Sequence, residues 1–118
     1  MAKVFGIHRL DLKLGVTAAE FEQVVADEFN ALPQGVPGWQ AASIVKGDRG
    51  DQVGQYLMIF EIESVEARDK AARGDGTFSP EAQQAIAQAA PVFDKLNGYL
   101  RHKLGEETPF TDYVAVGK

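Results

Sequence analysis

The order of the predicted secondary-structure elements constrains this chain more than any other feature, because a strand–helix–strand unit occurs twice. Alternating or continuous apolar runs predict four strands, at Lys3–Lys13, Trp39–Lys46, Gln55–Ile62 and Asp112–Val116. Helical spacing predicts one helix that opens at Thr17 and a second helical segment that opens at Ser64. The order is therefore β-α-β-β-α-β, and the 118 residues are expected to form one domain over residues 1–118.

The first helix has a start signal and a stop signal. Thr17 and Glu20 form a Thr-x-x-Glu capping box, in which each side chain accepts a backbone N–H group of the other residue. Apolar residues follow at helical spacing for about four turns, and Pro33 is expected to end the helix. The stripe predicted to face the sheet contains Phe21, Val25 and Phe29.

The second helical segment is predicted to be broken. Ser64 caps a short helix over Val65–Arg73, and a glycine-rich stretch separates it from a second helix capped by Ser79. Apolar spacing carries that helix to Leu104, and Pro91 is expected to kink it or split it. An alternative makes Tyr99–Leu104 a strand, and both interpretations remain open at this point.

The two faces of the predicted sheet differ in character. Val4, Gly6, His8 and Leu10 share the more apolar face of the first strand, which is expected to meet the helices. The opposite face would carry an apolar patch too large for a monomer to expose, formed by Phe5, Ile7, Leu57 and Ile59. Pairing two sheets face to face would cover this patch, so a homodimer is expected.

Composition excludes several classes of function. A net charge of −5 without a clustered basic face argues against nucleic acid as a partner. The chain has no cysteine, which excludes disulfides, thiolate metal sites and a cysteine nucleophile. No apolar run approaches the roughly 20 residues of a membrane span, and no signal peptide is visible. We therefore expect a cytoplasmic protein with no membrane partner.

The β-α-β-β-α-β order is the ferredoxin-like split-βαβ pattern, an α+β fold with a four-stranded antiparallel sheet. Three stretches carry a closer resemblance: the opening strand Val4–Leu12, the run Pro37–Gln40 before a strand, and Gln55–Arg68, where a strand passes directly into a Ser-capped helix. Together they resemble the dimeric α+β barrel superfamily over nearly the whole chain.

That resemblance implies a homodimeric barrel made from two sheets. Members of the superfamily include small monooxygenases that lack metal and flavin, polyketide cyclases, lactone isomerases, haem-degrading enzymes and stress-response proteins. The stretches that carry the resemblance contain no catalytic motif. The broken segment from Ser64 to Leu104 is also longer than in the simplest members. The resemblance therefore implies a fold and a range of functions, without assigning residue roles after Gly74.

His8 is the candidate catalytic residue, because a neutral imidazole with a pKa near 6.5 suits acid/base chemistry. Some proteins that this chain resembles use a histidine in this way, in a pocket between sheet and helices. The other interpretation is a core or interface histidine bonded to a backbone carbonyl. No carboxylate lies on the Val4–Leu12 face, so we expect burial to keep His8 neutral at about pH 7.

Three aromatic residues are candidate substrate-binding residues: Trp39, Tyr56 and Tyr99. Each combines a large apolar surface with one polar atom, which suits a pocket wall and a dimer core equally. Tyr113 is a weaker candidate of the same kind. The expected ligand is a small apolar or aromatic molecule.

Neither a metal nor another cofactor is expected. The only two histidines, His8 and His102, are far apart in sequence and have no spaced carboxylate ligand. Either could be an axial haem ligand, although the chain has no haem motif. His102 is expected on a solvated helix face, where a cation favours the helix dipole.

Two functions remain open from the sequence. The first is cofactor-independent oxygenation, cyclisation or isomerisation of a small aromatic or polyketide-like molecule, with His8 as the acid/base group. The second is a non-catalytic dimeric protein that binds a small molecule or responds to stress. A pocket where His8 meets a tyrosine hydroxyl would favour the first, and an interior filled by side chains would favour the second.

Overall fold

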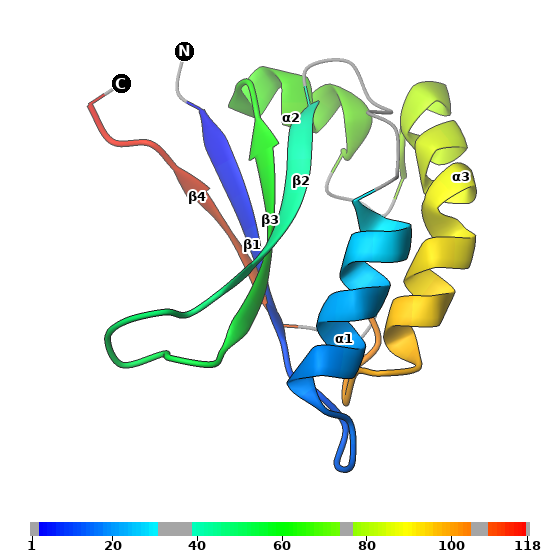
Figure 1. Cartoon of the computed structure of the whole chain (residues 1–118). Helices are drawn as coiled ribbons and strands as arrows, with labels where there is room; N and C mark the ends of the chain where they lie inside the picture. Colours follow the sequence, from blue (N-terminus) through cyan, green and yellow to red (C-terminus); the bar gives the residue numbers. More distant parts are fainter. Residues whose placement is uncertain (1–2, 31–38, 74–76, 105–108, 118) are drawn as a thin grey trace.

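The structure, a computed structural model, describes residues 3–30, 39–73, 77–104 and 109–117, excluding the side chains of residues 39–41. Figure 1 shows its elements, which in chain order are β1 (Val4–Leu10), α1 (Ala18–Val24), the π-helical turn η1 (Val25–Phe29), β2 (Trp39–Lys46), β3 (Tyr56–Ile62), α2 (Val65–Ala71), α3 (Pro80–Asn97) and β4 (Phe110–Val114). The predicted order is confirmed, and the second helical segment is broken into α2 and α3.

The four strands form one antiparallel sheet in the order β2-β3-β1-β4. The strongest apolar run of the sequence, β3, therefore lies in the centre beside β1, as predicted. In Figure 1, α1 and α3 stand on the same side of the sheet, and the opposite face has no helix over it. This is the two-layer arrangement expected for a ferredoxin-like α+β fold.

Strand register sorts the side chains onto these two faces. Val4 is paired with Ile62 and Leu10 with Tyr56, and all four residues are buried. Because side chains alternate along a strand, His8 lies on the same helix-covered face as Val4 and Leu10. The predicted assignment of this face is confirmed.

The predicted capping box opens α1. Thr17 Oγ1 accepts a hydrogen bond from the Glu20 N–H at 3.1 Å, and Glu20 Oε2 accepts one from the Thr17 N–H at 3.3 Å. The helix then widens into η1, where the Asn30 N–H donates to the Val25 carbonyl, five residues earlier, at 2.9 Å. The predicted stop at Pro33 lies outside the described residues.

The helix α3 begins as predicted and ends earlier than predicted. The Ser79 side chain caps it, and Pro80 occupies its first turn. It remains one helix through Pro91, so the predicted split does not occur. The predicted continuation to Leu104 is wrong, because α3 ends at Asn97 and the Gly98 N–H bonds back to the last turn.

The segment after α3 pairs with the chain beyond β1. Leu100 forms an isolated antiparallel bridge with Leu12. The Lys13 N–H donates to the Tyr99 carbonyl at 3.0 Å, and the Arg101 N–H donates to the Asp11 carbonyl at 2.8 Å. The alternative, a strand over all of Tyr99–Leu104, is therefore also wrong, because only Leu100 forms a bridge. The bridge and these two hydrogen bonds pair backbone groups that would otherwise need water.

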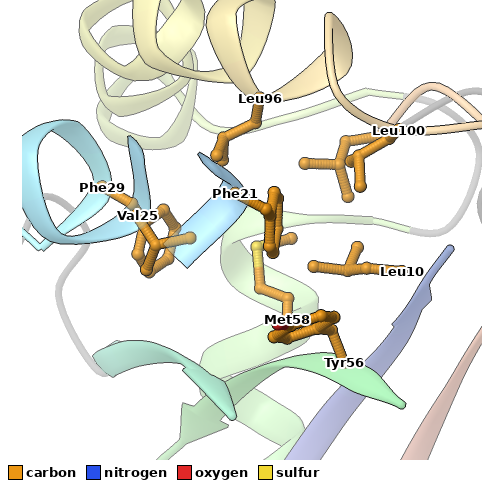
Figure 2. Packing of buried hydrophobic residues seen from close by; sticks show 9 residues of the cluster. Leu10, Phe21, Val25, Phe29, Tyr56, Met58, Leu96 and Leu100 are labelled. Carbon is orange, nitrogen blue, oxygen red and sulfur yellow. The ribbon is translucent and has the colours of Figure 1, made fainter. Parts of the chain in front are cut away.

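The main core lies between the sheet and the pair α1 and α3. Figure 2 shows Phe21 of α1 pointing toward Met58 and Tyr56 of β3, with Leu96 on the α3 side. Phe21 and Leu96 have no exposed surface. The predicted stripe is confirmed, because Phe21, Val25 and Phe29 are all buried. The space between the sheet and the helices α1 and α3 is thus occupied by packed apolar side chains.

The helix-free face of the sheet carries the predicted apolar residues. Phe5, Ile7, Leu57 and Ile59 are each half-buried by their neighbours on that face. Across the part of the chain that the structure describes, no helix is both long and apolar enough to cross a membrane.

Candidate functional site

His8 is framed by two aromatic rings. The register places it opposite Met58 on β3 and opposite Phe110 on β4. The Phe110 ring stacks on the imidazole with centroids 5.2 Å apart, and the Phe60 ring meets it edge-on at 5.4 Å. The histidine therefore lies in apolar surroundings, at the side of the sheet occupied by β4.

The imidazole of His8 is the one side chain among the described residues with a buried polar atom, Nδ1, that has no hydrogen-bond partner. Burial lowers the pKa of His8 from its ordinary value, and the nearby Asp112 carboxylate opposes that shift. His8 is therefore neutral at neutral pH. A neutral imidazole nitrogen can accept or donate a hydrogen bond, according to the tautomer, and this one does neither among the described residues.

Asp112 is a functional candidate that the sequence analysis missed. It lies on β4 opposite Gly6, so its side chain shares the helix-covered face with His8. Arg68 of α2 donates from Nη1 to its Oδ2 at 3.2 Å. The first strand carries no carboxylate on this face, and Asp112 reaches it from β4, which pairs with that strand. The alternation of side chains along β4 was the sequence signal that could have placed Asp112 on this face.

Tyr56 is held by a separate polar cluster. Its hydroxyl donates to Glu22 Oε2 of α1 at 2.5 Å, and Lys46 Nζ donates to the same oxygen at 3.0 Å. Burial, followed by the bond to Glu22, raises the pKa of Tyr56, while the Tyr56 and Lys46 bonds lower the pKa of Glu22. The hydroxyl thus meets Glu22 on α1, and no bond links it to His8 among the described residues.

A hollow of about 530 Å³ opens on the helix-free face of the sheet. Ile7, Val45 and Leu57 form part of its apolar lining. Arg9 and Gln55 are among its polar lining residues. Phe110 also lines it, so one residue both borders the hollow and covers His8.

The remaining predicted site residues are Tyr99, Trp39 and Tyr113. Tyr99 is half-buried against the main core, and the side chain of Trp39 lies outside the described residues. Tyr113 lines the hollow. In the described ranges, no group of three or more His, Asp or Glu side chains could hold a metal ion.

The comparisons with known proteins show which fold the chain has. No protein-family model matches the chain, and no curated protein matches it. SnoaB, a cofactor-independent oxygenase from Streptomyces nogalater, aligns over 98% of this chain and 95% of its own, with a TM-score of 0.53 and 17% identity. The chain has the ferredoxin-like fold.

Two further solved structures share this ferredoxin-like fold. A putative antibiotic biosynthesis monooxygenase from Bordetella bronchiseptica covers 98% of this chain and 99% of its own, with a TM-score of 0.54 and 14% identity. A dimeric ferredoxin-like protein of unknown function from Thermobifida fusca covers 97% and 92%, with a TM-score of 0.50 and 14% identity. At these identities the likeness concerns the fold of the domain.

Proposed function

We propose that this ferredoxin-like domain is a homodimer that performs cofactor-independent chemistry on a small aromatic or polyketide-like molecule. His8 is the proposed acid/base group. The observation that carries the proposal is the buried Nδ1 of His8, which has no hydrogen-bond partner among the described residues. Leaving a buried polar atom unpaired costs about 1–3 kcal/mol, so a ligand group that bonds it would be favoured.

The chemistry follows from the charge state of His8. Burial lowers its pKa, so the neutral ring can accept a proton from a phenolic O–H or an acidic C–H group at about pH 7. The ligand anion formed in this step can be reprotonated elsewhere, can close a ring, or can react with O₂ as the oxidant. The rings of Phe60 and Phe110 suit a planar ligand.

Access to His8 runs past Phe110. This residue begins the edge strand β4, and 63% of its surface is exposed. It also borders the hollow of about 530 Å³, which is within the size range of small-molecule sites. A movement of the Phe110 side chain would open the imidazole of His8 to a ligand from solvent at the β4 edge, on the face of the sheet opposite the hollow.

The proposed homodimer rests on the helix-free face. Phe5, Ile7, Leu57 and Ile59 form one apolar surface there, and a second copy of the same surface would cover it symmetrically. The similar protein from Thermobifida fusca is described as dimeric. The likeness to SnoaB, a cofactor-independent oxygenase, adds an analogy of fold to the chemical argument.

A non-catalytic binding protein is the second candidate. It is favoured by the filled interior between the sheet and the helices α1 and α3 and by the position of the hollow on the opposite face. In that case a small apolar molecule would occupy the hollow between two subunits, and His8 would have only a structural role.

The test is turnover by His8→Gln. Wild type and variant are incubated in air with a panel of planar phenols and 1,3-dicarbonyl compounds, and O₂ uptake and product mass are followed. We expect His8→Gln to lose at least about 100-fold in rate, the usual contribution of a general base. His102→Gln is the matched control and is expected to keep its rate. Equal rates in wild type and His8→Gln would overturn the proposal, and tight binding without turnover across the panel would favour the second candidate.

A further inference from the structure

The strongest unassigned feature of the molecule is the pair formed by Asp112 and Arg68. Asp112 is opposite Gly6, and His8 is opposite Phe110, so Asp112 and His8 are diagonal neighbours on one face of the sheet. Diagonal neighbours are typically about 7–8 Å apart. Asp112 and Arg68 keep only 29% and 26% of their side-chain surface exposed, so solvent screens their interaction less than at the open surface.

Gly6 provides the space for the Asp112 carboxylate. A Cβ atom at position 6 would lie 3.1 Å from Asp112 Oδ1, closer than almost all real contacts of that kind. One carboxylate oxygen therefore lies over Gly6, while the other, Oδ2, accepts the bond from Arg68. Gly6 and Arg68 therefore fix the position of the Asp112 carboxylate, with one contact for each oxygen atom.

Arg68 holds two carboxylates at once. Its Nη1 bonds Asp112 at 3.2 Å, and its Nε bonds Asp69 at 3.1 Å. Asp69 follows Arg68 on α2 and is exposed, whereas Asp112 belongs to the sheet face that carries His8. Asp69 and Asp112 therefore both bond Arg68, but only Asp112 belongs to the sheet face that carries His8.

We infer that Asp112 is a positioning residue for His8: its carboxylate, anchored by Arg68, stabilises the imidazolium that forms when His8 takes a proton from the ligand. This inference rests on the proposed function. In the step, with the ring proton of His8 on Nε2, the ligand's O–H or C–H bond breaks, its electron pair stays on the ligand, and the proton bonds to the Nδ1 lone pair. An imidazolium and a ligand anion result, and the proton stays on His8.

The surroundings of His8 support this role. On the β3 side, His8 neighbours Met58 and Phe60, which carry no charge. The charged groups recorded there among the described residues are Asp112 on β4 and, bonded to it, Arg68 on α2. Asp112 also favours the protonated form of His8 against the effect of burial on its pKa. A buried base benefits from such a counter-charge only when it becomes protonated.

The first test is an NMR titration of His8 without any ligand. Asp112→Asn is expected to shift the pKa of His8 downward, because it removes the charge that favours the cation. Asp69→Asn is the matched control, since it also removes a partner of Arg68, and it should leave the pKa of His8 unchanged. An unchanged His8 pKa in Asp112→Asn would overturn the inference. If Asp112→Asn does not fold, Arg68→Gln is titrated instead, and the loss of the guanidinium that offsets the Asp112 charge is expected to raise the pKa of His8; an unchanged His8 pKa would overturn the inference.

The second test uses the pH dependence of turnover. A base is active when neutral, so the rate rises with pH through the pKa of His8. In Asp112→Asn this rise should move to lower pH and the plateau rate should fall, because a weaker base remains. A purely structural Asp112 would lower stability without moving the pH profile, which would contradict the inference. A shifted His8 pKa together with full turnover in His8→Gln would refute the proposed function while leaving the coupling established.

Discussion

The ring of Phe110 covers the imidazole of His8, with centroids 5.2 Å apart and an interplanar angle of 17°. Phe110 comes from an edge strand and is largely exposed, whereas His8 comes from a central strand of the sheet. The Phe110 side chain at the edge of the sheet therefore separates the histidine from solvent.

Removing this cover should change the charge state of His8. Phe110→Ala is expected to raise the pKa of His8 toward its ordinary value, because water would then solvate the cation. NMR titration of the imidazole measures the shift. Tyr113→Ala is the control, since Tyr113 is exposed on the opposite face of the same strand. A His8 pKa that is the same in Phe110→Ala as in wild type would show that Phe110 does not shield it.

The lowered pKa of His8 also predicts a pH dependence of stability. An unfolded histidine titrates near 6.5 and the folded His8 below it, so the unfolded state binds more protons between these two values. Stability therefore rises with pH across this window and is lost as pH falls below about 6.5. Urea unfolding of wild type and His8→Gln at about pH 5.5 and about pH 7.5 isolates the effect. Wild type should lose more stability on acidification than His8→Gln does, and equal losses would argue against a buried neutral His8.

The stripe on the first helix should be a major source of stability. Phe29 is 4% exposed, and Phe29→Ala is expected to cost about 3–5 kcal/mol of unfolding free energy through lost burial and the cavity left behind. Asn30→Ala, at the exposed neighbouring position, should cost far less. Chemical denaturation measures both, and a loss below about 1 kcal/mol in Phe29→Ala would contradict its place in the core.

The helix-free face should form the subunit interface. We expect a symmetric dimer that buries on the order of 1,600 Å² in total. Ile59→Glu places a charge in the centre of that face and should give a monomer in sedimentation at micromolar concentration. Ile86→Glu is the control on α3, where Ile86 is exposed, and it should remain dimeric. Wild type that sediments as a monomer would rule out the proposed assembly.

Local rules predicted most of the fold. The capping box at Thr17 and the Ser-Pro start at Ser79 placed both helix starts, because these residues satisfy backbone groups that no other part of the helix can satisfy. The end of α3 was not predictable in this way. Apolar spacing continues past Asn97, but Leu100 turns away to bridge Leu12. That choice depends on a partner far away in the sequence.

The candidate site was only partly predictable for the same reason. Alternation along β1 placed His8 on the helix-covered face, since it depends on one strand alone. Asp112 comes beside it only through the pairing of β1 with β4, more than 100 residues of chain apart. Tyr56 was predicted as a pocket wall, and nothing in its strand pattern reveals that its hydroxyl bonds Glu22 on α1.

The most direct measurement of the central claim is an NMR titration of His8 in ¹⁵N-histidine-labelled protein, with and without 1-naphthol as a planar phenol. His8→Gln assigns the signal, because the chain has only two histidines. We expect a His8 pKa below its ordinary value and a change in the Nδ1 chemical shift when 1-naphthol is added. A His8 that titrates at the ordinary value and whose Nδ1 signal ignores the phenol would contradict a buried base open to ligand.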